Sequence, residues 1–169
     1  MNYLDITYRD INNGLGLRVT LWLSGCSHHC DGCHNPQTWD ETNGYKFDDE
    51  AKQYLFHVLN HPYIRGVTFS GGDPLFKSNR EEVLQLILEL KEKYPDKDIL
   101  LYTGYTYEEI TEDKSMYEIL KYLDVLIEGV FVLKLRDITL PFKGSPNQRI
   151  INVPKSLQQN KIVLLEGLT

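Results

Sequence analysis

The sequence predicts an α/β fold built around a parallel β-sheet, and three observations support this class. Segments with the alternating pattern of strands are followed by segments with a helical period, and this order repeats along the chain. Glycine-containing stretches stand at the ends of three of the expected strands. With 169 residues, 41% of them hydrophobic and 25% charged, the chain has the length and composition of one globular domain.

The first expected elements surround the most unusual stretch of the chain. Residues 18–23 (RVTLWL) alternate and are rich in β-formers, which predicts a strand that ends at Gly25. A helix is expected over 48–59, because its first three residues are acidic and suit a helix N-terminus. Residues 64–69 (IRGVTF) predict a second strand, which the turn sequence SGGDP ends.

Residues 79–93 predict the clearest helix. Its apolar residues Val83, Leu86, Ile87 and Leu90 fall on one face. Asn79 is the expected N-cap, and two glutamates follow it in the first turn.

The later elements continue the alternation and then become weaker. Residues 98–102 (DILLY) predict a third strand closed by TGY, and a helix follows over 107–122. Residues 124–127 (DVLI) predict a fourth strand. We expect a loop over 143–149 and late strands at 150–153 and 162–165.

Charge and composition exclude several classes of function. The net charge of -6 and the pI of about 5.3 leave no basic surface for nucleic acid. No apolar run approaches the roughly 20 residues that span a bilayer, and the N-terminus lacks the core of a signal peptide. Three cysteines without an export signal indicate a reducing cytoplasm and a metal or reactive role. We therefore expect a cytoplasmic protein.

The three cysteines lie within one short stretch, GCSHHCDGCHN (25–35). Their spacing, C-x3-C-x2-C, requires one loop to wrap around one metal centre. In one interpretation His28, His29 or His34 completes a closed Cys3His zinc site. In the other, Cys26, Cys30 and Cys33 hold three irons of a [4Fe-4S] cluster and leave the fourth iron open. Spacing favours the cluster, because structural zinc sites usually pair two ligand knuckles separated by a spacer.

Together, these motifs resemble those of the radical S-adenosylmethionine (SAM) enzymes. The C-x3-C-x2-C motif follows the first core strand, and GGDP follows the second. Within that superfamily the chain resembles the anaerobic ribonucleoside-triphosphate reductase activating proteins, over about residues 1 to 150. Its matching stretches are NGLGLRVTLWLSGC (13–26), CDGCHNPQTW (30–39), FSGGDPL (69–75), LYTGYTYEE (101–109), DVLIEGVF (124–131) and GSPNQR (144–149).

The resemblance implies a fold and a set of site residues. It implies a single radical SAM domain over residues 1–169, folded as a partial (open) parallel βα barrel. It implies that Cys26, Cys30 and Cys33 bind the cluster and that SAM occupies the open iron. The GGDP loop then binds the methionine amino group through Gly72, and Gly32, Cys33 and His34 lie near the adenine. No residue is expected to act as a general acid or base. His28 and His29 are expected to face solvent.

The resemblance also implies a reaction and partners. The activity is an oxidoreductase that reductively cleaves SAM to a 5′-deoxyadenosyl radical, which creates a glycyl radical on the large subunit of an anaerobic (class III) reductase. The electron donor would be a protein such as reduced flavodoxin. The alternatives are another radical SAM enzyme, either a pyruvate formate-lyase activase or a small-molecule enzyme, and the zinc-binding adaptor.

Overall fold

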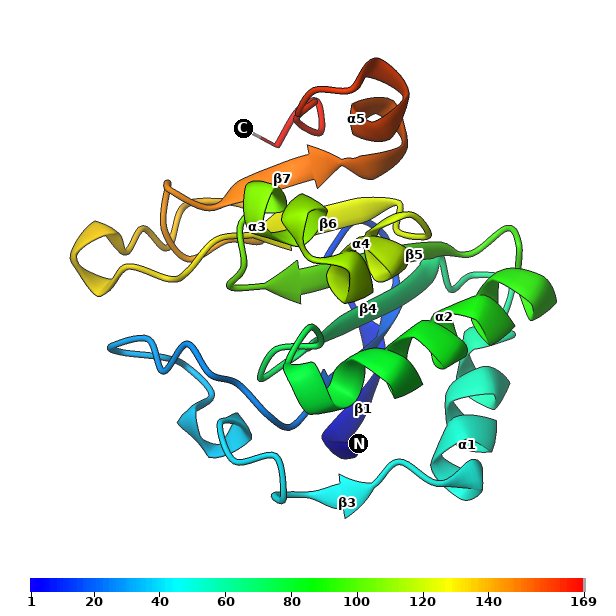
Figure 1. Ribbon diagram of the computed structural model, residues 1–169. Coiled ribbons are helices and arrows are strands. Elements are labelled where there is room, and N and C mark those ends of the chain that lie inside the picture. The colour runs from blue at the N-terminus through cyan, green and yellow to red at the C-terminus, as the bar shows by residue number, and fades with distance from the viewer. Residues whose placement is uncertain (169) are drawn as a thin grey trace.

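The fold is a seven-stranded β-sheet whose helices pack on one face (Figure 1). The structure is a computed structural model that describes residues 1–168. The strands are β1 (Asn2–Asp10), β2 (Arg18–Leu23), β3 (Tyr45–Lys46), β4 (Gly66–Gly71), β5 (Asp98–Thr103), β6 (Val125–Glu128) and β7 (Arg149–Asn152). The α-helices are α1 (Asp49–Leu59), α2 (Arg80–Lys93), α3 (Tyr107–Glu112), α4 (Lys114–Leu120) and α5 (Val153–Gln159). Short 3-10 helices are η1 (Pro36–Thr38), η2 (Lys77–Asn79) and η3 (Leu133–Leu135). The predicted α/β class is confirmed.

The sheet is mixed, with a parallel centre and antiparallel edges. Its strand order is β3-β1-β2-β4-β5-β6-β7. β2, β4, β5 and β6 are parallel, whereas β1, β3 and β7 pair antiparallel to their neighbours. A parallel pair needs a long crossover, usually a helix, and no α-helix separates β1 from β2 or β6 from β7. The expectation of a parallel sheet therefore holds only for the four central strands.

Two helix starts differ from the simple pattern. Asn79 precedes α2, but its side chain makes no capping bond and instead donates to the Ser24 carbonyl at 2.8 Å. The single helix expected over 107–122 is two helices, because Asp113 interrupts it in an extended conformation. The Asp113 carboxylate then accepts from the N–H groups of Ser115 and Met116 and caps α4.

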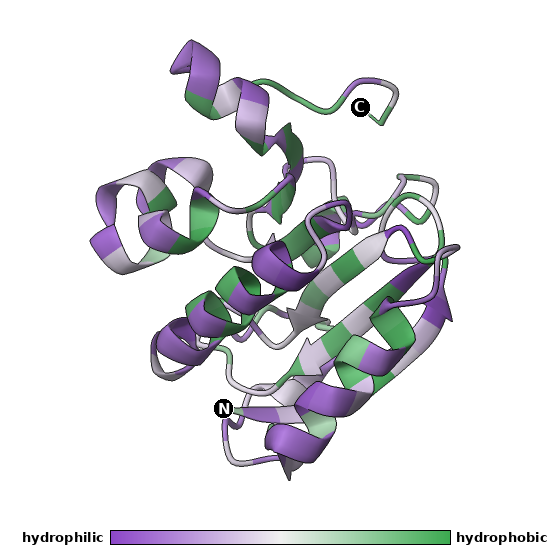
Figure 2. Ribbon diagram, turned by 90° about the vertical axis from the view of Figure 1, so that its right-hand side faces the viewer, coloured by the Kyte–Doolittle hydropathy of each residue, from purple (hydrophilic) through white to green (hydrophobic). Residues whose placement is uncertain are grey.

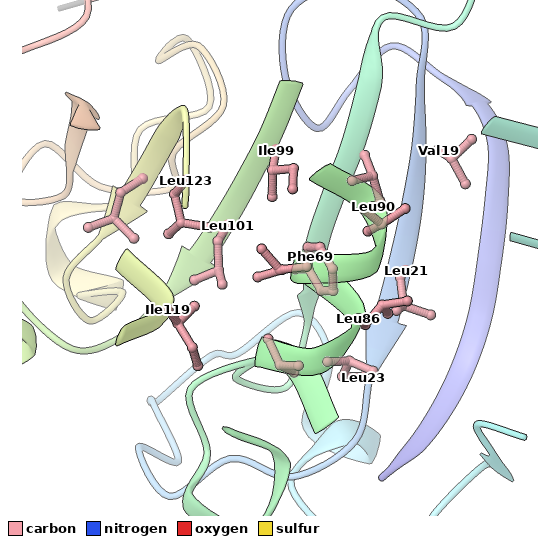
Figure 3. Close-up of a cluster of buried hydrophobic side chains, with 14 of the residues drawn as sticks. Val19, Leu21, Leu23, Phe69, Leu86, Leu90, Ile99, Leu101, Ile119 and Leu123 are labelled. Atoms are coloured by element: carbon pink, nitrogen blue, oxygen red, sulfur yellow. The ribbon is translucent and has the colours of Figure 1, made fainter. Parts of the chain in front are cut away.

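One face of the sheet carries the main hydrophobic core. Every α-helix contributes to the core, and Figure 2 shows these helices striped with hydrophobic and hydrophilic residues. The predicted apolar face of α2 is buried as expected. Leu86 and Leu90 of α2 lie over Phe69 of β4 (Figure 3). Each fully buried side chain of this kind stabilises the fold by about 1.5–3 kcal/mol.

The other face of the sheet is partly polar. Arg18 is buried there, donates to Thr68 Oγ1 at 2.7 Å, and pairs with Asp98 at 2.6 Å. A smaller apolar cluster (Leu100, Ile127 and Ile150) covers the rest, and the C-terminal residues Leu165 and Leu168 pack against it. Residues 162–165 were expected to form a strand, but only an isolated bridge between Ile151 and Leu164 forms there. None of the helices in residues 1–168 has both the length and the hydropathy to cross a membrane.

Candidate functional site

Three loops meet at one edge of the sheet, as the sequence predicts. The cysteine loop (residues 24–35) follows β2, the GGDP loop (71–74) begins at the last residue of β4, and the turn of residues 103–106 begins at the last residue of β5. Because these strands are adjacent and parallel, their carboxyl ends lie side by side. A cavity of about 460 Å³ lies there, and all three loops line it. This cavity is the candidate functional site.

The cysteine loop places all of its thiols on the cavity wall. The three half-buried, free cysteines are Cys26, Cys30 and Cys33. The end of η1 and the residue after it fix the start of the loop. The N–H groups of Gly25 and Cys26 donate to the carbonyls of Thr38 and Trp39 at 2.7 and 3.1 Å. The loop is thus anchored by backbone bonds at its first cysteine.

Backbone N–H groups surround the sulfur atoms. Asn35 N–H donates to Cys33 Sγ at 3.4 Å, and Phe131 N–H donates to Cys30. Burial raises the pKa of the Cys26 thiol to about 11, although N–H groups of the loop oppose that shift. Such N–H groups favour a thiolate and tune a cluster bound to it. The loop therefore offers donors that suit metal-bound sulfur.

The three cysteines supply soft thiolate sulfur, a donor type that suits iron–sulfur clusters and zinc. A zinc site requires four donors converging within about 2.0–2.3 Å of one ion. Within residues 1–168, no three His, Cys, Asp or Glu side chains converge in this way. A [4Fe-4S] cluster takes each thiolate on a different iron and so accepts cysteines that do not converge on one point. The donor set fits the cluster.

His28 is engaged inside the site, so the expectation that it faces solvent is wrong. Its side chain is only 16% exposed, and Nε2 lies 2.8 Å from Asp73 Oδ2. Its ring also packs edge-on against Tyr105 at 4.6 Å. The hydrogen bond to Asp73 raises the pKa of His28, against the effect of burial. Sequence reasoning missed this contact because the two residues are 45 positions apart.

The other two histidines lie on the outer surface of the loop. His29 is exposed, as predicted, and stacks on Trp39 at 4.5 Å. His34 is also exposed but lines the cavity, where its ring lies edge-on to Phe131 at 5.9 Å. Of the residues expected near an adenine, Cys33 and His34 therefore reach the cavity wall.

Gly32 and Gly72 occupy two different environments. Gly32 has φ +70°, which favours glycine, and a Cβ there would lie 2.7 Å from the Leu133 side chain. Gly32 is not among the residues that line the cavity. Gly72 lines it, and a Cβ on Gly72 would lie 2.5 Å from the Gly25 oxygen and 2.8 Å from the Thr38 oxygen. Gly72 is thus also required for the GGDP loop to pack against the cysteine loop.

Asp73 joins the three loops through its buried carboxylate, which is 1% exposed. It accepts from Leu75 N in its own loop at 2.8 Å and from His28 in the cysteine loop. From the end of β5 it accepts from Thr103 Oγ1 at 2.9 Å and Gly104 N at 3.0 Å. A carboxylate offers about four acceptor positions, and these donors use them. Asp73 therefore holds the site together and has no acceptor left for a ligand.

Several residues to which the sequence reasoning gave no role line the cavity. Asn12 and Asn13 reach it from the loop between β1 and β2. Tyr102 lines it from β5, and burial raises the pKa of its hydroxyl, as does the nearby carboxylate of Asp10. Lys143 is the only lysine or arginine among the described lining residues. Asn13 and Tyr102 lie in stretches that match the family, whereas no motif marks Asn12 or Lys143, which the fold brings from distant segments.

The GSPNQR stretch (144–149) holds the loop that connects β6 to β7. Gln148 Nε2 donates to the Gly129 carbonyl at 2.9 Å, and Asn147 Nδ2 donates to the Val130 carbonyl at 2.8 Å. Arg149 pairs across the strands with the buried Glu128 at 2.6 Å. This stretch therefore closes the base of the loop and completes the edge of the sheet.

Comparisons with known proteins agree with the geometry. A family model described as a 4Fe-4S single cluster domain matches residues 12–151, a range that contains every described residue lining the cavity. Curated relatives carry the name anaerobic ribonucleoside-triphosphate reductase-activating protein. The chain belongs to this family. The relative from Enterobacteria phage T4 is 43% identical over 150 residues, covering 89% of this chain and 93% of the relative.

Cellular members of the family are similar over the same length. The Haemophilus influenzae protein is 43% identical over 152 residues, covering 89% of this chain and 97% of its own. The Escherichia coli K12 protein is 37% identical over 150 residues, covering 88% of this chain and 96% of its own. The match therefore spans nearly the whole of each relative, and the resemblance inferred from the motifs is confirmed.

Proposed function

We propose that the chain is the activase of an anaerobic ribonucleoside-triphosphate reductase and works as a radical SAM enzyme. The observation that carries the proposal is the placement of three free cysteines of one loop on the wall of a single cavity, beside the GGDP loop. Relatives at 37–43% identity that are named as reductase-activating proteins support the same function.

The fold supports an open βα barrel with one radical SAM domain over residues 1–169. A closed barrel of this class has eight parallel strands, whereas this sheet has four at its centre and ends at the edges β3 and β7. An open side leaves room for a polypeptide to reach the cavity. That feature suits an enzyme whose substrate is a glycine of another protein.

In this proposal, the cysteine loop holds the [4Fe-4S] cluster through Cys26, Cys30 and Cys33. When bound and reduced, the cluster would supply one electron for the cleavage of the C5′–S bond of SAM. The products would be methionine and a 5′-deoxyadenosyl radical, which would take a hydrogen atom from the reductase glycine and become 5′-deoxyadenosine. The chain itself binds, orients and shields the reactants. An outside protein such as reduced flavodoxin supplies the electron.

The cavity wall supplies the proposed contacts with SAM. Gly72 donates its N–H to the Leu23 carbonyl at 2.7 Å, and its own carbonyl accepts no hydrogen bond among residues 1–168, so it suits the methionine ammonium group. Lys143 brings the positive charge that suits the methionine carboxylate. Gly32, Cys33 and His34 lie on the stretch proposed to contact the adenine. The aromatic side chain of Phe131, beside His34, helps to exclude water.

The test is anaerobic incubation of the reconstituted chain with SAM, a reductant and the reductase, followed by electron paramagnetic resonance. We expect a doublet glycyl-radical signal on the reductase, and no signal with the Cys33→Ala variant. Turnover of a small substrate without a partner, and no doublet, would instead indicate another radical SAM enzyme. A colourless, zinc-loaded protein after iron and sulfide reconstitution would refute both.

A further inference from the structure

The loop between β6 and β7 is unusually long for a connection between adjacent antiparallel strands. β6 ends at Glu128 and β7 begins at Arg149, so the loop contains residues 129–148, which is 20 residues. Hairpin loops usually have about 2–5 residues, and loops longer than about 12–15 residues usually serve a function. Because hydrogen bonds from the GSPNQR stretch hold the base of the loop, the loop has a defined position in the fold. Figure 1 shows it projecting beyond the sheet on the same side as the cysteine loop.

The tip of this loop, residues 130–138, exposes apolar side chains. Val130, Leu133, Leu135 and Ile138 are exposed by 41%, 47%, 48% and 84%. They make up four of the ten large hydrophobic side chains found exposed in residues 1–168. Single exposed apolar residues are ordinary, but a cluster of four within nine residues indicates an interaction surface.

The tip is also locally basic on an acidic protein. Lys134 and Arg136 are exposed, and no carboxylate in residues 1–168 lies within ion-pair distance of either. The neighbouring carboxylate of Asp137 pairs with neither cation and accepts from Thr139 N and Oγ1. Since the whole chain has a net charge of -6, these two cations give the tip a sign opposite to that of the molecule.

The tip continues directly into the candidate site. Val130 and Phe131 line the cavity at the start of the loop, and Phe142 and Lys143 line it near the end. Leu133 lies against Gly32 of the cysteine loop. A molecule that covers the tip therefore also covers the edge of the cavity.

We infer that the loop tip is the docking surface for the reductase. The matching surface of the reductase would be an apolar patch bordered by acidic side chains. This inference rests on the proposed function, and it assigns the contact to specific residues. A protein partner fits because the exposed side chains of Leu133, Leu135 and Ile138 stand outside the cavity, where a small substrate would not reach. An acidic border fits because it complements Lys134 and Arg136. A second copy of this chain fits less well, since a symmetric contact would bring like charges together.

Two pairs of substitutions test the inference without touching the cavity wall. Leu135→Ser with Ile138→Ser removes apolar area, and Lys134→Glu with Arg136→Glu reverses the charge. The matched controls are Tyr54→Ser, an exposed aromatic residue of α1, and Lys46→Glu, an exposed lysine of β3. Binding to the reductase is measured by calorimetry at low and high salt. SAM cleavage with a chemical reductant is measured without the reductase.

We expect each tip pair to raise the dissociation constant for the reductase by about tenfold or more. The charge reversal should lose most of its effect at high salt, whereas the apolar pair should not. Both tip variants should cleave SAM without the reductase as the native protein does, and both controls should bind normally.

The possible failures are distinguishable. If the native chain gives no glycyl radical on the reductase, the proposed function fails. If the native chain activates the reductase and the tip variants bind and activate equally well, the docking inference fails alone. Loss of a dimer of this chain in the tip variants, with unchanged reductase affinity, would also overturn it and make the tip a self-association surface.

Discussion

Replacing Asp73 by asparagine should destabilise the whole site, because this carboxylate joins three loops. The substitution nearly preserves volume but turns one carboxylate oxygen into an NH₂ donor. Oδ1 accepts from the backbone N–H of Leu75, and Oδ2 accepts from that of Gly104. Whichever oxygen becomes the amide nitrogen, one of these N–H groups then faces another donor. The side chain cannot rotate to avoid this conflict.

The size of the effect follows from these contacts. A buried donor that loses its acceptor costs about 1–3 kcal/mol. The remaining bonds lose the charge of the acceptor, and a charged acceptor makes bonds roughly twice as strong as a neutral one. We expect Asp73→Asn to lower the free energy of unfolding by about 2–4 kcal/mol. Asp96→Asn, at an exposed position, should change it by less than about 0.5 kcal/mol.

The assay has two parts under anaerobic conditions. Urea unfolding gives the free energy, and the rate of iron loss to a chelator reports how firmly the cysteine loop holds the cluster. Because Asp73 reaches the cysteine loop through His28, Asp73→Asn should speed iron loss as well as lower stability. His28→Gln should speed iron loss with a smaller effect on unfolding, since the bonds to Thr103 and Gly104 remain.

A different outcome would refute the reasoning. If Asp73→Asn retained native stability and iron retention but bound SAM weakly, Asp73 would be a ligand residue and not a joint between loops. Unchanged stability with unchanged SAM affinity would show that the carboxylate contributes little to either.

Three further predictions address the cluster, the cosubstrate and a helix cap. Alanine at any one of the three cysteines should abolish the stable cluster, measured as iron and sulfide per chain, because no spare cysteine exists; full iron content would contradict this. Lys143→Met should weaken SAM binding and leave the iron content unchanged. Gly72→Ala should reduce both SAM binding and iron content, because its Cβ would push against the Gly25 carbonyl. Equal effects of the two variants on iron content would contradict this prediction. Hydrogen bonds from Ser115 lower the pKa of Asp113 to about 2 from its usual value of 3.8. The Asp113 cap therefore stabilises the fold fully above about pH 3.8, and this stabilisation is lost as the pH falls toward 2. Asp113→Ala should therefore cost about 1 kcal/mol in urea unfolding at pH 6 and much less near pH 2; a pH-independent cost would contradict the assignment.

The central part of the fold could be predicted from the sequence because its signals are local. β2 has the predicted bounds, and the apolar stripe of α2 identifies the covered face. β1 was missed because only two of its nine residues are buried, so it lacks a clear alternation. α5 was missed although Asn152 caps it and Pro154 stands in its first turn, which are recognisable start signals.

The candidate site also has a part that could be predicted from the sequence and a part that could not. The cysteine and GGDP motifs are contiguous, so sequence alone could locate them and the strand order could place them on one rim. Contacts between the loops could not be predicted, because they depend on how far each loop reaches. The bond between His28 and Asp73 and the approach of Lys143 are of this kind. The role of the GSPNQR stretch likewise became clear only from its bonds to residues 129–130.

The polar groups of the cavity divide into those that hold the loops together and those that are left to contact a ligand. Asp73 is the only carboxylate residue among the described lining residues, and its acceptor positions are taken. Gln148 is also engaged, because its Oε1 accepts from Gly144 N and its Nε2 donates to the Gly129 carbonyl. The groups that remain include the three thiols, backbone atoms, the Ser70 hydroxyl, the His34 imidazole, amides and one lysine, which suit the proposed roles of holding a cluster and orienting an amino acid moiety. A site whose one carboxylate joins the loops is suited to the proposed role of keeping reactants in place while a bound cofactor performs the chemistry.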